Sequence, residues 1–221
     1  MLKLEVLFML VTLLSLLSFS LAIEHDKRVI ILFGTWFLVI GLLSILGFFE
    51  NTSALPPRFV FVLLPASALV IIAYRSLTNK PVLAWLIAVH MVRIPVELIL
   101  FELYGQGLVP RAMTFQGWNY DILSGITAGV ALFLYVAGRL NRWVLLFWNG
   151  IALILLLIIV VTAALSVPTP IQQLAFDQPN TAVLRFPFTW LPAVIVPVVF
   201  LSHLLIFRMA YAPQHIRRGL I

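Results

Sequence analysis

Seven long apolar stretches limit what this chain can fold into more than any other feature of its sequence. They occupy residues 4–23, 29–49, 59–75, 81–101, 121–138, 142–166 and 187–207. A helix that crosses the hydrocarbon core of a bilayer needs about 20 mostly apolar residues, so each stretch is predicted to be a transmembrane helix. The sequence therefore predicts an all-α, polytopic membrane helix bundle with seven transmembrane helices, forming a single integral membrane domain over residues 1–221.

The composition agrees with a membrane protein and excludes several other classes. Of the 221 residues, 63% are hydrophobic and 10% are charged, whereas a soluble domain has about 45–50% apolar and about 25% charged residues. These values exclude a soluble enzyme, a disordered tail and a nucleic-acid-binding domain. The chain has no cysteine and therefore no disulfide. We expect the lipid bilayer as its partner and no nucleic acid, and the sequence predicts no particular oligomeric state.

The net charge of +6 is explained by the orientation of the helices rather than by binding to nucleic acid. Basic residues gather at the cytoplasmic ends of membrane helices. Nine basic residues fall on one side of the predicted spans: Lys27, Arg28, Arg75, Lys80, Arg139, Arg142, Arg208, Arg217 and Arg218. The opposite side has four, which are Lys3, Arg58, Arg111 and Arg185. This asymmetry predicts an outside N-terminus, a cytoplasmic C-terminus and a multi-pass protein of the plasma membrane, or of the inner membrane in a bacterium.

Two segments of the chain are similar to each other and suggest an internal repeat. Residues 58–66 read Arg-Phe-Val-Phe-Val-Leu-Leu-Pro-Ala, and residues 185–193 share six of these nine identities. They open the third and seventh spans, which suggests two parallel three-helix halves joined by the fourth span. Chance similarity among common apolar residues is the alternative. This 3+1+3 plan is similar to that of the SWEET sugar carriers, but the sequence has no proline in the first two helices of either half.

Span four carries three ionisable residues, and such residues inside a membrane helix are candidates for function. At about 100° per residue, His90, Arg93 and Glu97 fall within about 60° of one another around the helix. Arg93 and Glu97 are also four residues apart, a spacing at which they can form an ion pair. Pro95 lies between them and is expected to kink the helix and free the carbonyl of Met91. A polar site for a solute or proton and a purely structural network both fit this pattern.

Span five opens with two further polar residues, Asn119 and Asp121. Asp121 is a candidate N-cap, because its carboxylate can accept hydrogen bonds from the first turn. Gly125 and Gly129 form a small-xxx-small motif, which allows close contact with another helix. Such contact would bring Asp121 near Arg93 and make it a second partner for the guanidinium.

His203 in the seventh span has two predicted roles. Near the cytoplasmic end of its helix, it is expected to face the lipid headgroups. Alternatively, His90 and His203 together hold a haem or a zinc ion. The helical rise of 1.5 Å per residue places His90 about 14 Å and His203 about 7 Å from the same side, which counts against a shared site.

Three classes of function follow from these residues. The first is a small-solute or ion carrier, coupled to protons, whose pathway includes His90, Arg93, Glu97, Asp121 and Asn119. The second is a membrane-embedded haem- or metal-dependent enzyme or redox protein. The third is a seven-helix sensor, which is not retinal-based because the last span has no lysine. The sequence favours the carrier and predicts no catalytic residue.

Overall fold

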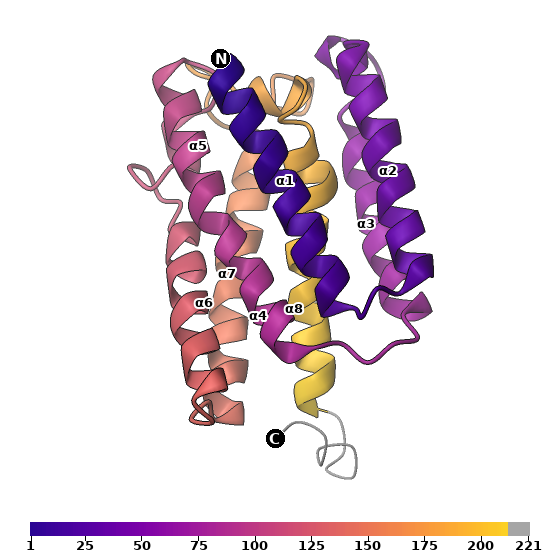
Figure 1. The fold of residues 1–221 in the computed structure, drawn as a ribbon. Helices are drawn as coiled ribbons and strands as arrows, with labels where there is room; N and C mark the ends of the chain where they lie inside the picture. The colour runs from indigo at the N-terminus through magenta and orange to yellow at the C-terminus, as the bar shows by residue number, and fades with distance from the viewer. Residues whose placement is uncertain (212–221) are drawn as a thin grey trace.

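The computed structural model describes residues 1–211, which form helices and connecting segments without a strand. The α-helices are α1 (Leu2–Ala22), α2 (Lys27–Ile45), α3 (Val60–Ser76), α4 (Leu83–Val89), α5 (Arg93–Gly105), α6 (Asp121–Val136), α7 (Arg142–Leu165) and α8 (Val196–Tyr211). Four short 3₁₀ turns and one π-helical turn complete the set: η1 (Phe48–Glu50), η2 (His90–Val92), η3 (Arg111–Met113), η4 (Ala182–Leu184) and the π turn η5 (Leu191–Ile195). Because η2 joins α4 to α5 and η5 leads into α8, the described residues form seven rods, which lie side by side in Figure 1.

Five of the rods are long and apolar enough to cross a bilayer, which indicates a membrane protein. They are α1, α2, α4–α5 (Leu83–Gly105), α7 and η5–α8 (Leu191–Tyr211). The other two rods, α3 and α6, are apolar but have only 17 and 16 residues. The all-helical fold is therefore confirmed, whereas seven crossings stay a prediction.

Two rods form the centre of the bundle. In α4–α5 and η5–α8, 56% and 61% of the apolar stretch is buried, against 28% in α1, α2 and α7. Helix α4 packs against α1, α6 and α8, and α8 packs against α3, α4 and α7. The outer helices expose leucine, isoleucine and phenylalanine side chains, which is the surface that lipid tails solvate. Polar side chains that lie on the two central rods are therefore shielded from both water and lipid.

The prolines of the central rods coincide with changes in helix type. Helix α4–α5 tightens to a 3₁₀ turn at His90–Val92, just before Pro95, and a π turn covers Leu191–Ile195. Pro197 has no N–H for the carbonyl of Ala193, four residues earlier. The indole Nε1 of Trp36 donates to that carbonyl at 2.9 Å and so ties α2 to η5. In α3, by contrast, Pro65 lies inside an uninterrupted helix.

The segment between α5 and α6 folds back into the bundle instead of remaining outside it. Met113, Thr114 and Asn119 are buried, while Trp118 and Tyr120 stay exposed. Helix α6 consequently begins well inside the bundle, beside the middle of α4–α5 (Figure 1). Non-helical backbone at such depth is tolerated only where protein surrounds it. The segment 167–186 is also partly buried, through Val167, Asn180 and residues 182–184.

One carboxylate fixes the end of the bundle at which α1 joins α2 and α3 joins α4, here called the basic end. Asp26 accepts hydrogen bonds from the Thr78 N–H at 3.0 Å, the Thr78 hydroxyl at 2.8 Å and the Arg28 N–H at 3.1 Å. Burial by itself raises the pKa of Asp26. The hydrogen bonds together lower it by more than burial raises it, so the resulting pKa is about 2. Asp26 therefore joins the two turns through an ionised side chain.

Seven of the nine basic residues assigned to the cytoplasm belong to segments at this basic end, where α6 also joins α7 and α8 ends. Arg217 and Arg218 lie outside the described residues. The direction of insertion into a membrane stays a prediction.

The two similar nonapeptides have different backbones. Residues 58–66 run directly into α3 at Val60, whereas residues 185–193 pass through a turn into the π turn η5. The internal repeat is therefore not confirmed.

Candidate functional site

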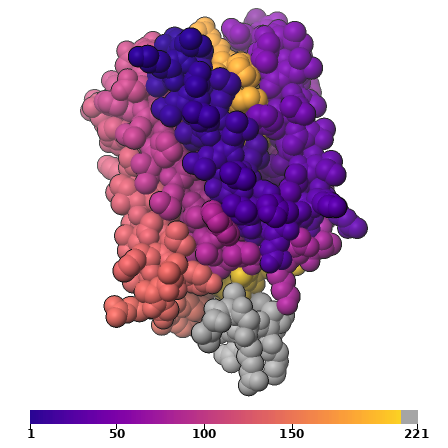
Figure 2. All heavy atoms as spheres, in the orientation of Figure 1, coloured from indigo at the N-terminus to yellow at the C-terminus, as the bar shows by residue number. Residues whose placement is uncertain are grey.

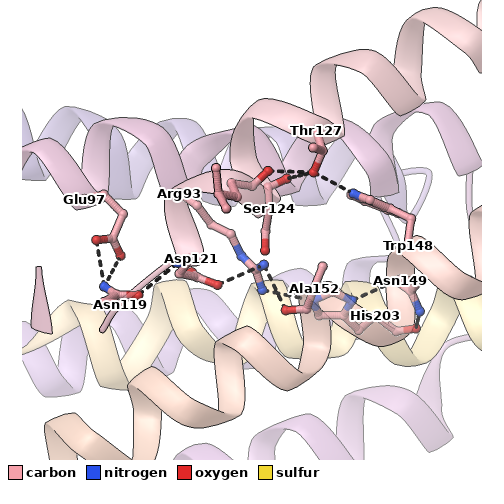
Figure 3. Close-up of polar contacts among 11 residues, drawn as sticks. Arg93, Glu97, Asn119, Asp121, Ser124, Thr127, Trp148, Asn149, Ala152 and His203 are labelled. Atoms are coloured by element: carbon pink, nitrogen blue, oxygen red, sulfur yellow. Dashed lines mark hydrogen bonds and ion pairs between the residues drawn. The ribbon is translucent and has the colours of Figure 1, made fainter. Parts of the chain in front are cut away.

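Arg93 is the centre of a buried polar cluster that joins four helices (Figure 3). Its Nη1 lies 3.2 Å from Oδ1 of Asp121 in α6 and donates to the carbonyl of Ala152 in α7 at 3.1 Å. Its Nη2 donates to Nε2 of His203 in α8 at 2.9 Å. The predicted approach of Asp121 to Arg93 is thus present.

Close packing of α6 against α5 explains this ion pair. A Cβ atom on Gly125 would lie 2.8 Å from Ile94 Cγ1, so the two helices touch at the glycine. The predicted pairing of Arg93 with Glu97 was wrong: among residues 1–211, the carboxylate paired with Arg93 belongs to Asp121. The guanidinium turns toward α6, α7 and α8 instead of along its own helix.

Glu97 lies one turn beyond Arg93 on α5 and is held by an amide. The Nδ2 of Asn119 donates to both carboxylate oxygens of Glu97, at 2.7 Å each, and to the carbonyl of Met113 at 2.9 Å. The Oδ1 of Asn119 accepts from the N–H of Asp121 at 3.0 Å. The predicted N-cap role of Asp121 was therefore wrong, because Asp121 lies inside the first turn, where the Asn119 side chain accepts its N–H.

His203 is fully buried, so the expectation that it faces the headgroups was wrong. Helix α8 continues to Tyr211, which places His203 about 12 Å inside its end. A guanidinium has only donors, so Nε2 of His203 accepts from Arg93 and the ring proton is on Nδ1. Nδ1 then donates to Oδ1 of Asn149 at 2.7 Å. Nδ2 of Asn149 donates back to the His203 carbonyl at 3.2 Å, which fixes the orientation of the amide.

His90 lies against His203, with ring centroids 4.2 Å apart. Neither ring nitrogen of His90 has a hydrogen-bond partner among the described residues, although the side chain is fully buried. The expected difference in depth was wrong, because α4 begins at Leu83 and places His90 only about 10 Å from its end. The Trp148 ring also contacts His90 in a T-shaped arrangement, at 5.4 Å between centroids.

The two histidines do not fit the alternative of a haem or zinc site. Both nitrogens of His203 are engaged, by Arg93 and Asn149. The imidazoles are in van der Waals contact, which leaves no room for a macrocycle between them. Within residues 1–211, no three His, Cys, Asp or Glu side chains lie close enough together to hold a metal ion.

A cavity of about 70 Å³ lies beside the polar cluster, on the side where α3 begins and α7 ends. Three charged side chains line it, namely Arg93, Glu97 and Asp121. The remaining walls are apolar and come from α3, α5, α7 and η5–α8, with Met113 and Val183 from the connecting segments. This space is large enough for a few water molecules or a small solute.

Some members of the cluster carry little or no signal in the sequence. Asn149 could be found as a lone amide in an apolar span, and it forms an interhelical hydrogen bond with His203. The Ala152 carbonyl has no signal, because any residue presents one. The Met113 carbonyl belongs to the polar cluster only because the segment before α6 folds inward.

The comparisons with known proteins give a family and no function. Residues 53–211 match the model of the family described as "Domain of unknown function (DUF8737)". The chain belongs to this family. The DUF8737 region contains every side chain of the polar cluster, from His90 to His203, whereas α1 and α2 precede it. No curated protein and no solved structure matches the chain, so the architectural similarity to the SWEET carriers has no support from these comparisons.

Proposed function

We propose that this DUF8737 protein is a proton-coupled carrier of a small solute, and that the solute binds in the cavity beside Arg93. The observation that carries this proposal is the lining of the cavity. Arg93, Glu97 and Asp121 come from two helices and line one otherwise apolar space in the interior of the bundle. A largely apolar cavity with a few convergent polar groups is typical of a small-molecule site.

The charges of the cluster give each residue a role. Arg93 and Asp121 form one ion pair, in which the two charges cancel. Glu97 has only the amide of Asn119 as a side-chain partner among the described residues, so its carboxyl is the group that gains and loses a proton. Asn119 and Asp121 orient the site, and His203 extends the polar line on the side of Arg93 away from Glu97 (Figure 3). His90 packs against the His203 ring.

The interrupted helices that border the cavity also support a carrier. The 3₁₀ turn at His90–Val92 directly precedes Arg93, and the π turn at Leu191–Ile195 lines the cavity. Single π turns inside helices are frequent at functional sites. Discontinuous helices also form the binding sites of many secondary transporters.

We propose a matching placement in the membrane. All seven rods cross the bilayer, the N-terminus lies outside, and the basic end faces the cytoplasm of a cell whose plasma membrane holds the protein. The concentration of basic residues at that end supports this orientation.

The test is proton movement in reconstituted vesicles that contain a pH-sensitive dye. Small amines, monocarboxylates and sugars are added one at a time, with protein-free vesicles as the blank. We expect at least one solute to change the internal pH, and Glu97→Gln to lower that rate at least tenfold. Glu102→Gln is the matched control, because Glu102 is an exposed carboxylate on the same helix.

Two results contradict the proposal. One is an unchanged rate in Glu97→Gln vesicles. The other is a wild-type protein that is folded in the vesicles but moves no proton with any solute of the panel.

A further inference from the structure

We infer that the cavity takes a lipophilic ammonium ion, which exchanges with a proton on Glu97. The inference rests on the proposed function and names the substrate class of the same site. It follows from three observations on the cavity: the balance of its charges, the nature of its walls and the place where it reaches the surface of the bundle.

The charges of the cavity leave one carboxylate without a cation. The buried ionisable side chains of residues 1–211 are Asp26, Arg93, Glu97 and Asp121, together with the histidines His90 and His203. Asp26 is bound at the basic end, and Asp121 is paired with Arg93. An ionised Glu97 is therefore unbalanced, and a buried charge without a counter-ion is costly. A cation in the cavity removes that cost.

An anion fits this cavity poorly. Arg93 is paired with Asp121 and donates to the Ala152 carbonyl and to His203, while its Nε has no partner among the described residues. An anionic solute that reached the guanidinium would lie close to the carboxylates of both Asp121 and Glu97, which repel it. An ammonium group fits better, because the carboxylate of Glu97 attracts it and accepts its hydrogen bonds.

The walls of the cavity determine the rest of the ligand. Apart from the three charged residues, the lining is apolar, with Leu100, Leu156 and Val199 among its buried side chains. A small hydrated cation would leave these walls without a favourable partner. An amine with a short hydrocarbon tail fills them, because burying each methylene is favourable by about 0.8 kcal/mol.

The cavity reaches the surface on the side of the bundle. Lining residues that are only half-buried come from the beginning of α3, the end of α7 and η5–α8: Leu63, Val160, Ala163, Ala164, Pro192 and Val196. Their neighbours Leu64 and Val161 are exposed and apolar, as on a lipid-facing surface. A ligand that enters here comes from the bilayer, and a lipophilic amine is a molecule that the bilayer concentrates.

The exchange balances in atoms and charge. The ammonium ion enters while the carboxyl of Glu97 is protonated, the O–H bond of the carboxyl breaks, and its proton leaves for water. Glu97 then holds the ammonium ion as an ion pair. The cavity carries the same net charge before and after, so one ammonium ion moves against one proton.

The test is calorimetric titration of the purified full chain in detergent with three probes of one tail length, whose tails are longer than the cavity and extend through its open side. Hexylamine carries the cationic head, hexanol a neutral head and hexanoate an anionic head, and empty micelles are the blank. We expect hexylamine to bind at least tenfold more tightly than hexanol, and hexanoate more weakly than either. Titrations in buffers of different ionisation enthalpy should give about one proton released per hexylamine.

Two pairs of variants locate the binding. Glu97→Gln should reduce hexylamine affinity to that of hexanol and leave hexanol affinity unchanged within twofold, whereas Glu102→Gln should change neither. Leu63→Trp fills the cavity mouth and should weaken hexylamine and hexanol alike at least fivefold. Leu64→Trp, on the exposed neighbour, should not.

The outcomes separate this inference from the proposed function. Equal affinity for hexylamine and hexanol, preference for hexanoate, or no proton release overturns the ammonium exchange. If vesicles still move protons with another solute, the carrier proposal stands. Conversely, hexylamine binding with the expected preference supports the ammonium site even if the vesicles show no proton movement. The absence of proton movement would contradict only the carrier proposal.

Discussion

At the scale of single residues, the cluster is an arrangement in which most polar atoms have a partner inside the bundle. Arg93 is paired with Asp121, Glu97 with Asn119, and His203 with Asn149. The buried atoms of the cluster that lack a hydrogen-bond partner in residues 1–211 include Nε of Arg93, Oγ of Ser124 and both ring nitrogens of the His90 imidazole. A network that served packing alone would gain nothing from that buried imidazole, so His90 and the cavity beside Glu97 are where function is to be sought.

The ion pair between Arg93 and Asp121 gives a prediction of stability. Asp121→Ala should lower the free energy of unfolding by about 3–5 kcal/mol, because it leaves a buried guanidinium without its counter-ion. Arg93→Met combined with Asp121→Leu should recover most of this loss. The measurement is chemical unfolding in detergent micelles. A double variant that is no more stable than Asp121→Ala would contradict the pairing.

Asp26 gives a prediction of pH dependence. Its pKa of about 2 in the folded protein lies below the ordinary value of 3.8, so its hydrogen bonds stabilise the fold above about pH 4. That stabilisation should disappear as the pH falls from about 4 to about 2. Wild type should melt at a higher temperature than Asp26→Asn at pH 7, and the difference should vanish near pH 2. A difference that is constant across this range would disprove the assignment.

At the scale of helices, the sequence predicted the elements well and their contacts less well. All seven apolar stretches are helical, because apolar runs in a low-dielectric environment must satisfy their backbone internally. The face shared by His90, Arg93 and Glu97 follows from the helical period. The partner of Arg93 depends on where α6 begins, which the inward-folded segment before Asp121 decides. The depth of His203 depends on the end of α8, where the sequence shows no sharp boundary.

The contact between α5 and α6 gives a prediction at this scale. Gly125→Ala should push α6 away from Ile94 and destabilise the fold by about 1–3 kcal/mol, as overpacked sites do. Gly129 is the matched control, since the nearest atom to an added Cβ is 3.9 Å away. Gly129→Ala should be neutral or should stabilise by up to about 1 kcal/mol, because alanine is the better helix former. Equal effects at both glycines, measured by thermal unfolding, would contradict the packing.

At the scale of the whole molecule, α4–α5 and η5–α8 are the most buried of the rods that are long enough to cross a bilayer. Figure 2, in the orientation of Figure 1, shows that α1 and its neighbours cover most of α8 on this face. The polar cluster lies on the central rods and on the helices that touch them. The absence of cysteine from the sequence makes the proposed orientation directly testable by single introduced cysteines.

Ser53→Cys and Gln173→Cys, both at exposed positions away from the basic end, should react with a membrane-impermeant maleimide in intact cells. Arg139→Cys, exposed at the basic end, should react only after the cells are permeabilised. If Arg139→Cys alone is labelled in intact cells, the orientation is opposite to the one proposed. If all three variants are labelled in intact cells, no membrane separates the two ends of the bundle.

The most direct test of the central claim compares Glu97→Gln with Glu102→Gln in the same vesicles, with solute-driven proton movement and thermal stability measured on one preparation. We predict that both variants stay folded and that only Glu97→Gln loses proton movement, at least tenfold. If Glu97→Gln moves protons as fast as wild type does, the cavity beside Arg93 is not the site of proton coupling.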